Sequence, residues 1–145
     1  MSAIAERLER IAAEISKVAR VGADKQEVWV EYEPKENQVL MSVYSTFDNE
    51  NNLPLNSLVD EDNDIRKVCV DIDRYIKSKY GYILRGWFPH ESRINIDKRR
   101  KKGTLMLGYG TWFNVYSNPK YPDFDYEDFL GELAKVVSPF KVIRK

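Results

Sequence analysis

The stretch EVWVEYEPKENQVLMSVYS, residues 27–45, decides the fold class of this chain. Apolar residues recur at every second position in both of its halves, which is the period of a half-buried β-strand. The expected inward-facing residues are Val28, Val30, Tyr32, Val39, Met41 and Val43. Residues 34–37, PKEN, form a turn signal between the halves, so the stretch predicts an antiparallel hairpin. Trp29, Leu40 and Tyr44 fall on the opposite face, which we expect to be partly covered or to be a contact surface.

The segment before this hairpin has the period of an amphipathic helix. Its apolar residues alternate between spacings of four and three, and they are Ile4, Leu8, Ile11, Ile15 and Val18. Ser2 is a suitable N-cap residue and Gly22 a suitable terminator. The pattern therefore predicts a helix from about residue 3 to 20 whose apolar stripe faces the core.

Two further helices follow. The segment DIRKVCVDIDRYIKSKYG, residues 64–81, predicts a helix capped by Asp60 or Asn63 and ended by Gly81. The segment FDYEDFLGELAKVV predicts a last helix from about Asp125, with acidic residues in its first turn. Residues 47–57, rich in asparagine and without a period, are expected to form a loop.

Strand signals return between these two helices, in four segments: YILRGWF (82–88), RINID (93–97), TLMLGYG (104–110) and TWFNVYS (111–117). The second and third flank a basic run and a glycine, which predicts a hairpin with a six-residue connection. Gly108 and Gly110 are typical of a bulge or bend in a long strand, and close approach of a ligand is the alternative.

The order α-ββ-α-βββ(β)-α predicts an α+β fold, with a mostly antiparallel β-sheet backed by helices. A length of 145 residues is close to the usual size of one domain, so we expect residues 1–145 to form a single domain. The chain has one cysteine, no apolar run long enough to span a membrane and no signal-peptide pattern. These features favour a cytoplasmic protein with no membrane partner.

No catalytic, metal or cofactor motif emerges from the sequence. His90 is the only histidine, and a general acid-base role in RNA cleavage is a less favoured interpretation than a surface loop position. Cys69 falls in a helix stripe, as a core residue does. The acidic residues of 60–64 have calcium-loop spacing, but Ile65 stands where that loop needs glycine. We therefore expect no cofactor, no metal and no enzyme activity.

Charge is unevenly distributed along the chain. Residues 1–65 hold 6 Lys/Arg and 14 Asp/Glu, a net charge of −8, and residues 66–145 hold 17 and 9, a net charge of +8. Two clusters are candidate binding sites. The candidate acidic surface consists of Asp48, Glu50, Asp60, Glu61, Asp62 and Asp64. The candidate basic hairpin tip consists of Lys98, Arg99, Arg100, Lys101 and Lys102.

Each cluster has a plain interpretation and a functional one. The acidic residues are typical of a solvated loop and helix start, or of a surface that mimics the phosphates of nucleic acid toward a basic nuclease. The basic residues are typical of a charged tip that keeps a sheet edge soluble, or of a contact with phosphates or with a protein partner.

The chain resembles the small YezG-type immunity proteins of bacteria. The resemblance lies in a leading amphipathic helix, an aromatic and acidic strand pair (VWVEYEP), a mid-chain helix, and a late aromatic strand followed by FDYEDF, residues 124–129. It implies a protein that neutralises a cognate toxin by blocking its active site, and it implies no catalytic residue.

The leading hypothesis is therefore a non-enzymatic protein-binding module, an immunity or antitoxin protein whose partner is a toxin, with a nuclease as one option. The alternative is a nucleic-acid-binding domain that uses the basic tip, residues 98–102. A small nuclease dependent on His90 is the third hypothesis.

Overall fold

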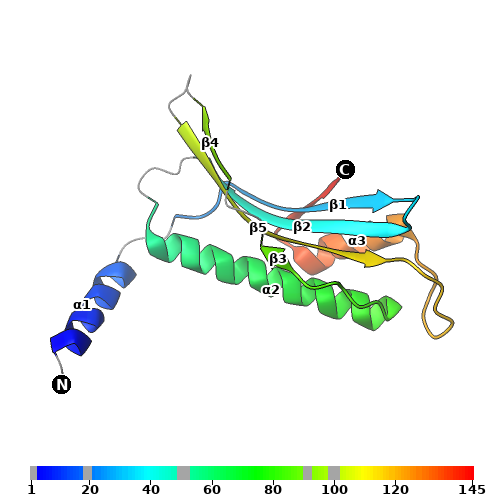
Figure 1. The fold of residues 1–145 in the computed structure, drawn as a ribbon, viewed down its shortest axis with the longest axis horizontal. Coiled ribbons are helices and arrows are strands. Elements are labelled where there is room, and N and C mark those ends of the chain that lie inside the picture. The colour runs from blue at the N-terminus through cyan, green and yellow to red at the C-terminus, as the bar shows by residue number, and fades with distance from the viewer. Residues whose placement is uncertain (1–2, 18–20, 49–52, 90–92, 98–101) are drawn as a thin grey trace.

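A computed structural model describes residues 3–17, 21–48, 53–89, 93–97 and 102–145 (Figure 1). The α+β fold is confirmed, and the order of helices and strands is the predicted one except for an additional strand after the last helix. In chain order the elements are α1 (Ala3–Lys17), β1 (Lys25–Glu33), β2 (Gln38–Phe47), α2 (Leu55–Tyr80), β3 (Phe88–Pro89), β4 (Arg93–Asp97), β5 (Lys102–Asn114), α3 (Tyr126–Val137) and β6 (Lys141–Arg144).

The strands form one sheet in the order β3-β5-β2-β1-β6, with β4 also paired to β5. All pairs are antiparallel except β1 with β6, which is parallel. The predicted first hairpin is confirmed: β1 and β2 pair from Lys25↔Thr46 to Glu33↔Gln38, and Asn37 in the turn has a φ of 49°. Asparagine tolerates this left-handed conformation better than most residues.

The late strands differ from the prediction in three ways. Of the segment YILRGWF, only Phe88 lies in a strand, the two-residue β3 that it forms with Pro89. TLMLGYG and TWFN form one continuous strand, β5, rather than two. The register between β2 and β5 runs unbroken from Gln38↔Asn114 to Phe47↔Leu105, so neither Gly108 nor Gly110 marks a bulge. Instead, a side chain at Gly108 would collide with the ring of Tyr44. Glycine therefore lets the ring lie directly on the neighbouring strand.

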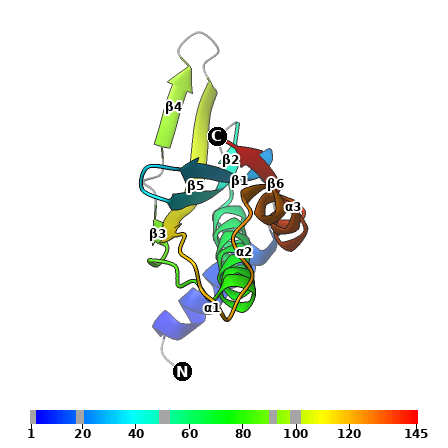
Figure 2. The same ribbon diagram turned by 90° about the vertical axis from the view of Figure 1, so that its right-hand side faces the viewer.

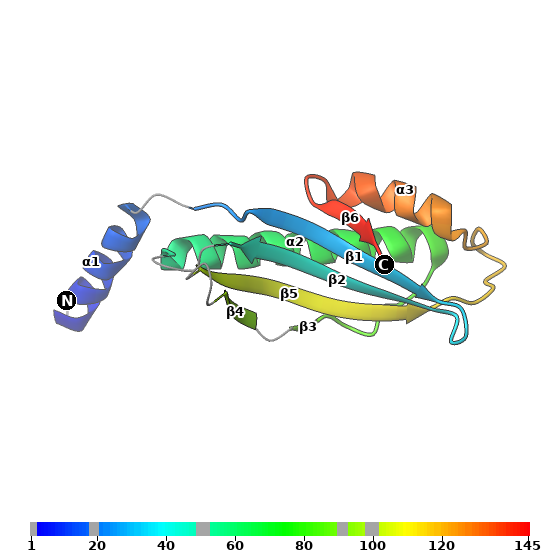
Figure 3. The same cartoon turned by 90° about the horizontal axis from the view of Figure 1, so that it is seen from above.

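Helices α2 and α3 cover one face of the sheet, as Figures 2 and 3 show, and the core lies between the two layers. Every second residue of β1 and β2 enters this core, and α2 contributes one side of its helix. The fully buried side chains include Val28, Val30, Val39, Val43, Ile65, Ile72, Ile76, Phe113, Phe129 and Leu133.

Helix α2 begins earlier than the sequence suggested. It starts at Leu55, directly after Pro54, so the caps expected at Asp60 or Asn63 lie inside the helix and that prediction was wrong. The physical reason is that proline suits a helix start, because the N–H that it lacks would have no partner within the helix there. The predicted end is confirmed, because Gly81 has a φ of 71° and donates its N–H to the carbonyl of Lys77.

Helix α1 does not face the core, and the prediction that it would do so was wrong. Ile4, Leu8 and Ile11 are 71%, 61% and 53% exposed. The helix projects beyond the end of α2 and lies against neither face of the sheet (Figures 1 and 3). The core is already filled by α2 and α3, so the apolar stripe of α1 has no place in it.

None of the helices in the described ranges has the length and apolar character needed to cross a lipid bilayer.

Candidate functional site

The five described acidic residues of the predicted surface do not form one patch. Asp48 follows β2 and is exposed, and Asp60 is exposed on α2, whereas Asp64 is only half exposed one turn later. Asp62 points elsewhere, since it accepts a hydrogen bond from the Tyr109 hydroxyl on β5 at 2.6 Å. Glu50 lies outside the described residues.

Glu61 is a clear correction. Its side chain is fully buried beneath the sheet, so it cannot belong to a binding surface. Its Oε1 accepts hydrogen bonds from Gln26 Nε2 at 2.7 Å and from Ser45 Oγ at 2.6 Å. A buried carboxylate with such partners ties the start of α2 to both β1 and β2. The carboxylate is therefore structural.

The predicted basic tip lies almost entirely outside the described residues. Residues 98–101 are not described, and Lys102 begins β5 with its backbone paired to Asp97. The predicted hairpin around them is confirmed, but its connection is residues 98–101 and thus shorter than expected.

A groove of about 590 Å³ lies between α2 and the β3–β5 edge. Its wall includes Val70, Trp87 and Pro89, and a polar network stands beside them. Asp62 joins Tyr109 and Arg66, whose Nε lies 2.9 Å from the Asp62 carboxylate. Cys69 also lines the groove, but burial raises the pKa of its thiol to about 12. The thiol is therefore protonated at neutral pH and is a poor nucleophile.

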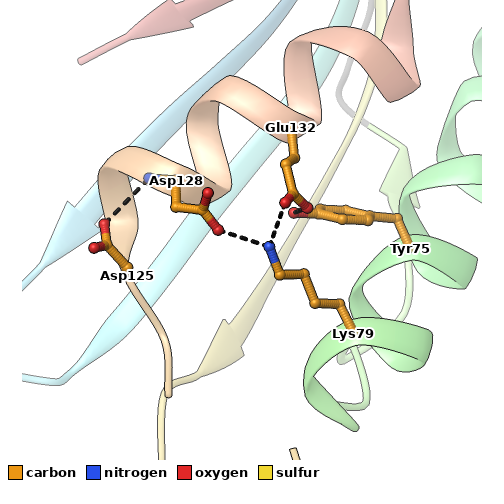
Figure 4. Close-up of polar contacts among 5 residues, drawn as sticks. All are labelled: Tyr75, Lys79, Asp125, Asp128 and Glu132. Carbon is orange, nitrogen blue, oxygen red and sulfur yellow. Dashed lines mark hydrogen bonds and ion pairs between the residues drawn. The ribbon is translucent and has the colours of Figure 1, made fainter. Parts of the chain in front are cut away.

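A second polar cluster joins α2 to α3 (Figure 4). Lys79 Nζ lies 2.6 Å from carboxylate oxygens of both Asp128 and Glu132, and Tyr75 donates its hydroxyl hydrogen to Glu132 at 2.8 Å. Desolvation works against the ammonium group, but the hydrogen bonds to Asp128 and Glu132 outweigh it and raise the pKa of Lys79. A lysine held in its charged form cannot serve as a base or nucleophile, so this cluster fastens the two helices together.

The segment that carries the family resemblance, residues 124–129, takes part in the same fastening. Asp125 caps α3 by accepting from the backbone N–H of Asp128 at 3.1 Å. Phe129 is buried, and Phe124 packs 5.4 Å from its ring. Tyr126 packs 5.3 Å from the ring of Tyr32 on β1. The acidic-aromatic string is thus occupied with holding α3 against the sheet.

The face of the sheet opposite to α2 and α3 is not covered by any described helix (Figure 3). The strand register places aromatic residues on this face. We call this set the open face; it consists of Trp29, Leu40, Tyr44, Phe88 and Trp112. Residues that pair across neighbouring strands point to the same face of the sheet. One row across the sheet consists of Trp29, Ser42, Gly110 and Phe88, each paired with the next.

Contacts within the open face hold its rings in place. Trp29 and Tyr44 meet edge to face with centroids 6.0 Å apart, and Phe88 stacks on Trp112 at 5.9 Å. Leu40 remains 39% exposed and Phe88 53% exposed. The alternation within β1 and β2 indicates Trp29, Leu40 and Tyr44 from the sequence, but Phe88 and Trp112 were not predicted. The alternation in TLMLGYGTWFN could have revealed Trp112, whereas Phe88 needed the pairing of β3 with β5.

The margin of the open face carries both signs of charge. Outward positions of β1 and the β6 segment supply three lysines and three glutamates, namely Lys25, Lys141, Lys145, Glu27, Glu31 and Glu33. Lys145 lies 4.8 Å from the centre of the Trp29 ring, a cation–π contact. The open face therefore has an aromatic centre, and its β1–β6 edge carries equal numbers of lysines and glutamates.

Within the described residues, no group of three or more His, Cys, Asp or Glu side chains is placed to hold a metal ion. The predicted His90 lies outside the described residues. Comparison with protein-family models, curated proteins and solved structures finds no match to this chain.

Proposed function

We propose that this chain is a non-enzymatic protein-binding module and that the open face is its binding surface. The supporting observation is a set of five apolar side chains, three of them from aromatic residues of the central strands. They lie on a sheet face that no described helix covers (Figure 3). Aromatic residues are enriched at the centres of protein interfaces, where they bury large areas with little loss of side-chain freedom.

The rim favours a protein partner over a nucleic acid. Phosphates are bound by surfaces with a net positive charge, and their affinity comes mainly from neutralised phosphates. Along its β1–β6 edge the open face has as many glutamates as lysines. A centre of aromatic residues with a rim of mixed charge is the usual composition of a protein–protein interface.

The finer proposal is that the partner is a bacterial toxin and that this chain is its immunity protein. It is supported by the layout shared with YezG-type proteins. The open face would occlude the toxin's active site in the way that an inhibitor does, by shape and apolar contact. Co-expression of the chain with the product of a neighbouring gene tests this form directly, because an immunity protein restores growth.

The binding surface is tested by capture of partners from the lysate of the chain's own host, with and without nuclease treatment. Wild type should retain a stoichiometric protein after nuclease. Leu40→Asp and Phe88→Asp should each lose most of it, because a buried unpaired carboxylate at an interface centre is costly. Both residues are partly exposed, so the variants should fold, as far-UV circular dichroism would show.

Val70→Asp is the matched control, since Val70 is 45% exposed but lies on α2, in the other layer. It should retain the partner. If only Val70→Asp lost the partner, the binding site would be the groove between α2 and β5. Recovery of nucleic acid, with no protein left after nuclease, would overturn the proposal in favour of the basic tip.

A further inference from the structure

The exposed stripe of α1 has the spacing of a coiled coil. Steps of four and three residues place Ile4, Leu8, Ile11 and Ile15 at the d, a, d and a positions of a heptad repeat. Such a stripe is too narrow for a globular core and is typical of a seam between two helices. The structure agrees, because Ile4, Leu8 and Ile11 are all more than half exposed.

The residues that flank the stripe define its partner. In the heptad register, Arg7 and Glu14 occupy the two g positions, and Ala5 and Ala12 occupy the two e positions. In a parallel pair each g residue faces an e residue of the other helix, so the charges would meet only alanine. In an antiparallel pair g faces g, so position 7 of each helix, an arginine, would face position 14 of the other, a glutamate. On the opposite side of the seam the e positions of the two helices would face each other. Both e positions are alanine, a small residue that permits close approach of the helices.

A second exposed apolar patch lies where α1 joins the body. Val21 is 46% exposed, and its backbone N–H donates to Ser57 Oγ at 2.7 Å, next to the first turn of α2. In that turn and the next, Leu55 and Val59 are 60% and 51% exposed. An antiparallel partner helix would bring its N-terminal end, with Ile4, toward this base patch of Val21, Leu55 and Val59.

From this charge complementarity and geometry, we propose that α1 is a dimerisation element that pairs antiparallel with α1 of a second copy of this chain. Two helices of about four turns alone bury less than the roughly 1,200 Å² of a small specific interface. In a two-fold symmetric dimer each copy contributes its own base patch to the interface, so the two patches add further buried area. The inference does not depend on the proposed function, because α1 and the open face are separate surfaces.

Sedimentation equilibrium of the full chain, up to about 100 µM, tests the proposal, since dimer formation depends on concentration. Wild type should be a dimer in this range. Leu8→Glu should be a monomer, because two carboxylates would be buried in the seam. Leu8 is 61% exposed within one chain, so this variant should retain the fold and its circular dichroism.

Charge exchange tests the orientation. Arg7→Glu and Glu14→Arg should each weaken dimerisation about tenfold, because two symmetry-related attractions become repulsions. The double variant should return to within about threefold of wild type. Residues 7 and 14 are too far apart on one helix to pair with each other. Arg10→Glu makes the same charge change on the outer face and should leave the dimer within about threefold of wild type.

Three results would overturn the proposal. They are a wild-type monomer at the highest concentration, a Leu8→Glu dimer as tight as wild type, and a double charge variant no tighter than the single variants. The last result would reject the antiparallel pairing in particular.

Discussion

Replacing Gly108 by alanine should destabilise the protein, even though the residue lies in a strand where glycine is usually unfavourable. The φ angle of Gly108 is an ordinary one for a strand, so the conflict is one of space. An alanine Cβ would lie 2.4 Å from Cδ1 of Tyr44 and 2.7 Å from the carbonyl oxygen of Val43. Comfortable carbon–carbon contacts are about 3.5–4.0 Å.

The size of the effect follows from which of these neighbours can move. The Tyr44 ring can turn, but the Val43 carbonyl belongs to the sheet backbone of β2 and is held there. Overpacking of this kind costs about 1–3 kcal/mol. Alanine also restricts the unfolded chain, which offsets about 0.4–1 kcal/mol. We expect Gly108→Ala to lower the free energy of unfolding by about 1–2 kcal/mol and the Tm by about 3–7 °C.

Urea and thermal denaturation measure the change, and Gly131→Ala is the matched control. Gly131 lies in α3 with no atom within 4 Å of its Cβ position, so alanine there should stabilise the protein by about 0.5–1 kcal/mol. The two identical substitutions should therefore have opposite signs. Adding Tyr44→Ala to Gly108→Ala should recover part of the loss in a double-mutant cycle. A Gly108→Ala variant as stable as wild type would refute the argument from close contact.

Three further predictions concern buried or coupled groups. Glu61→Ala should lower the free energy of unfolding by about 2–4 kcal/mol, because the two groups that donate hydrogen bonds to Glu61 lose their acceptor. The neighbouring control, Asp60→Ala, should change it by less than about 0.5 kcal/mol. Equal losses for the two variants in urea denaturation would contradict the buried network. Hydrogen bonding from Lys79 lowers the pKa of Glu132, so this carboxylate stabilises the fold above its ordinary pKa and the contribution is lost as pH falls through the folded value. The thermal melts of Glu132→Gln and wild type should therefore converge progressively as pH falls below the ordinary glutamate pKa of about 4.3 and through the lowered folded value, and parallel pH profiles would count against this coupling. Cys69 should react with a thiol reagent at pH 8 only after unfolding in urea, since burial raises the pKa of its thiol to about 12. Rapid labelling of the native protein would contradict this prediction, because it would show that the thiol is accessible.

The features that follow from local periodicity could be predicted from the sequence. The hairpin of β1 and β2 is set by a period of two and by a turn that suits Asn37, and both properties lie within twenty residues. The inward side of α2 was likewise predicted from its stripe, including the burial of Cys69. The α+β fold follows from the order of these elements.

The features that depend on contacts between distant residues could not be predicted. The pattern in α1 shows that the helix is amphipathic, but not which surface will cover its stripe. Glu61 was grouped with its acidic neighbours, because only the placement of Gln26 and Ser45 shows that it is buried. Strand β6 has just four residues and no clear alternation, and its place depends on a parallel partner at the other end of the chain.

That parallel pairing also bears on how the protein is made. β6 must find β1, which lies roughly a hundred residues earlier in the chain. Contacts of such long range slow folding, because a large loop has to close before any of them forms. During synthesis the β1 edge of the sheet therefore waits without its neighbour until α3 and β6 have left the ribosome. In that interval the unpaired edge of β1 is a place where a chaperone or another nascent chain can bind.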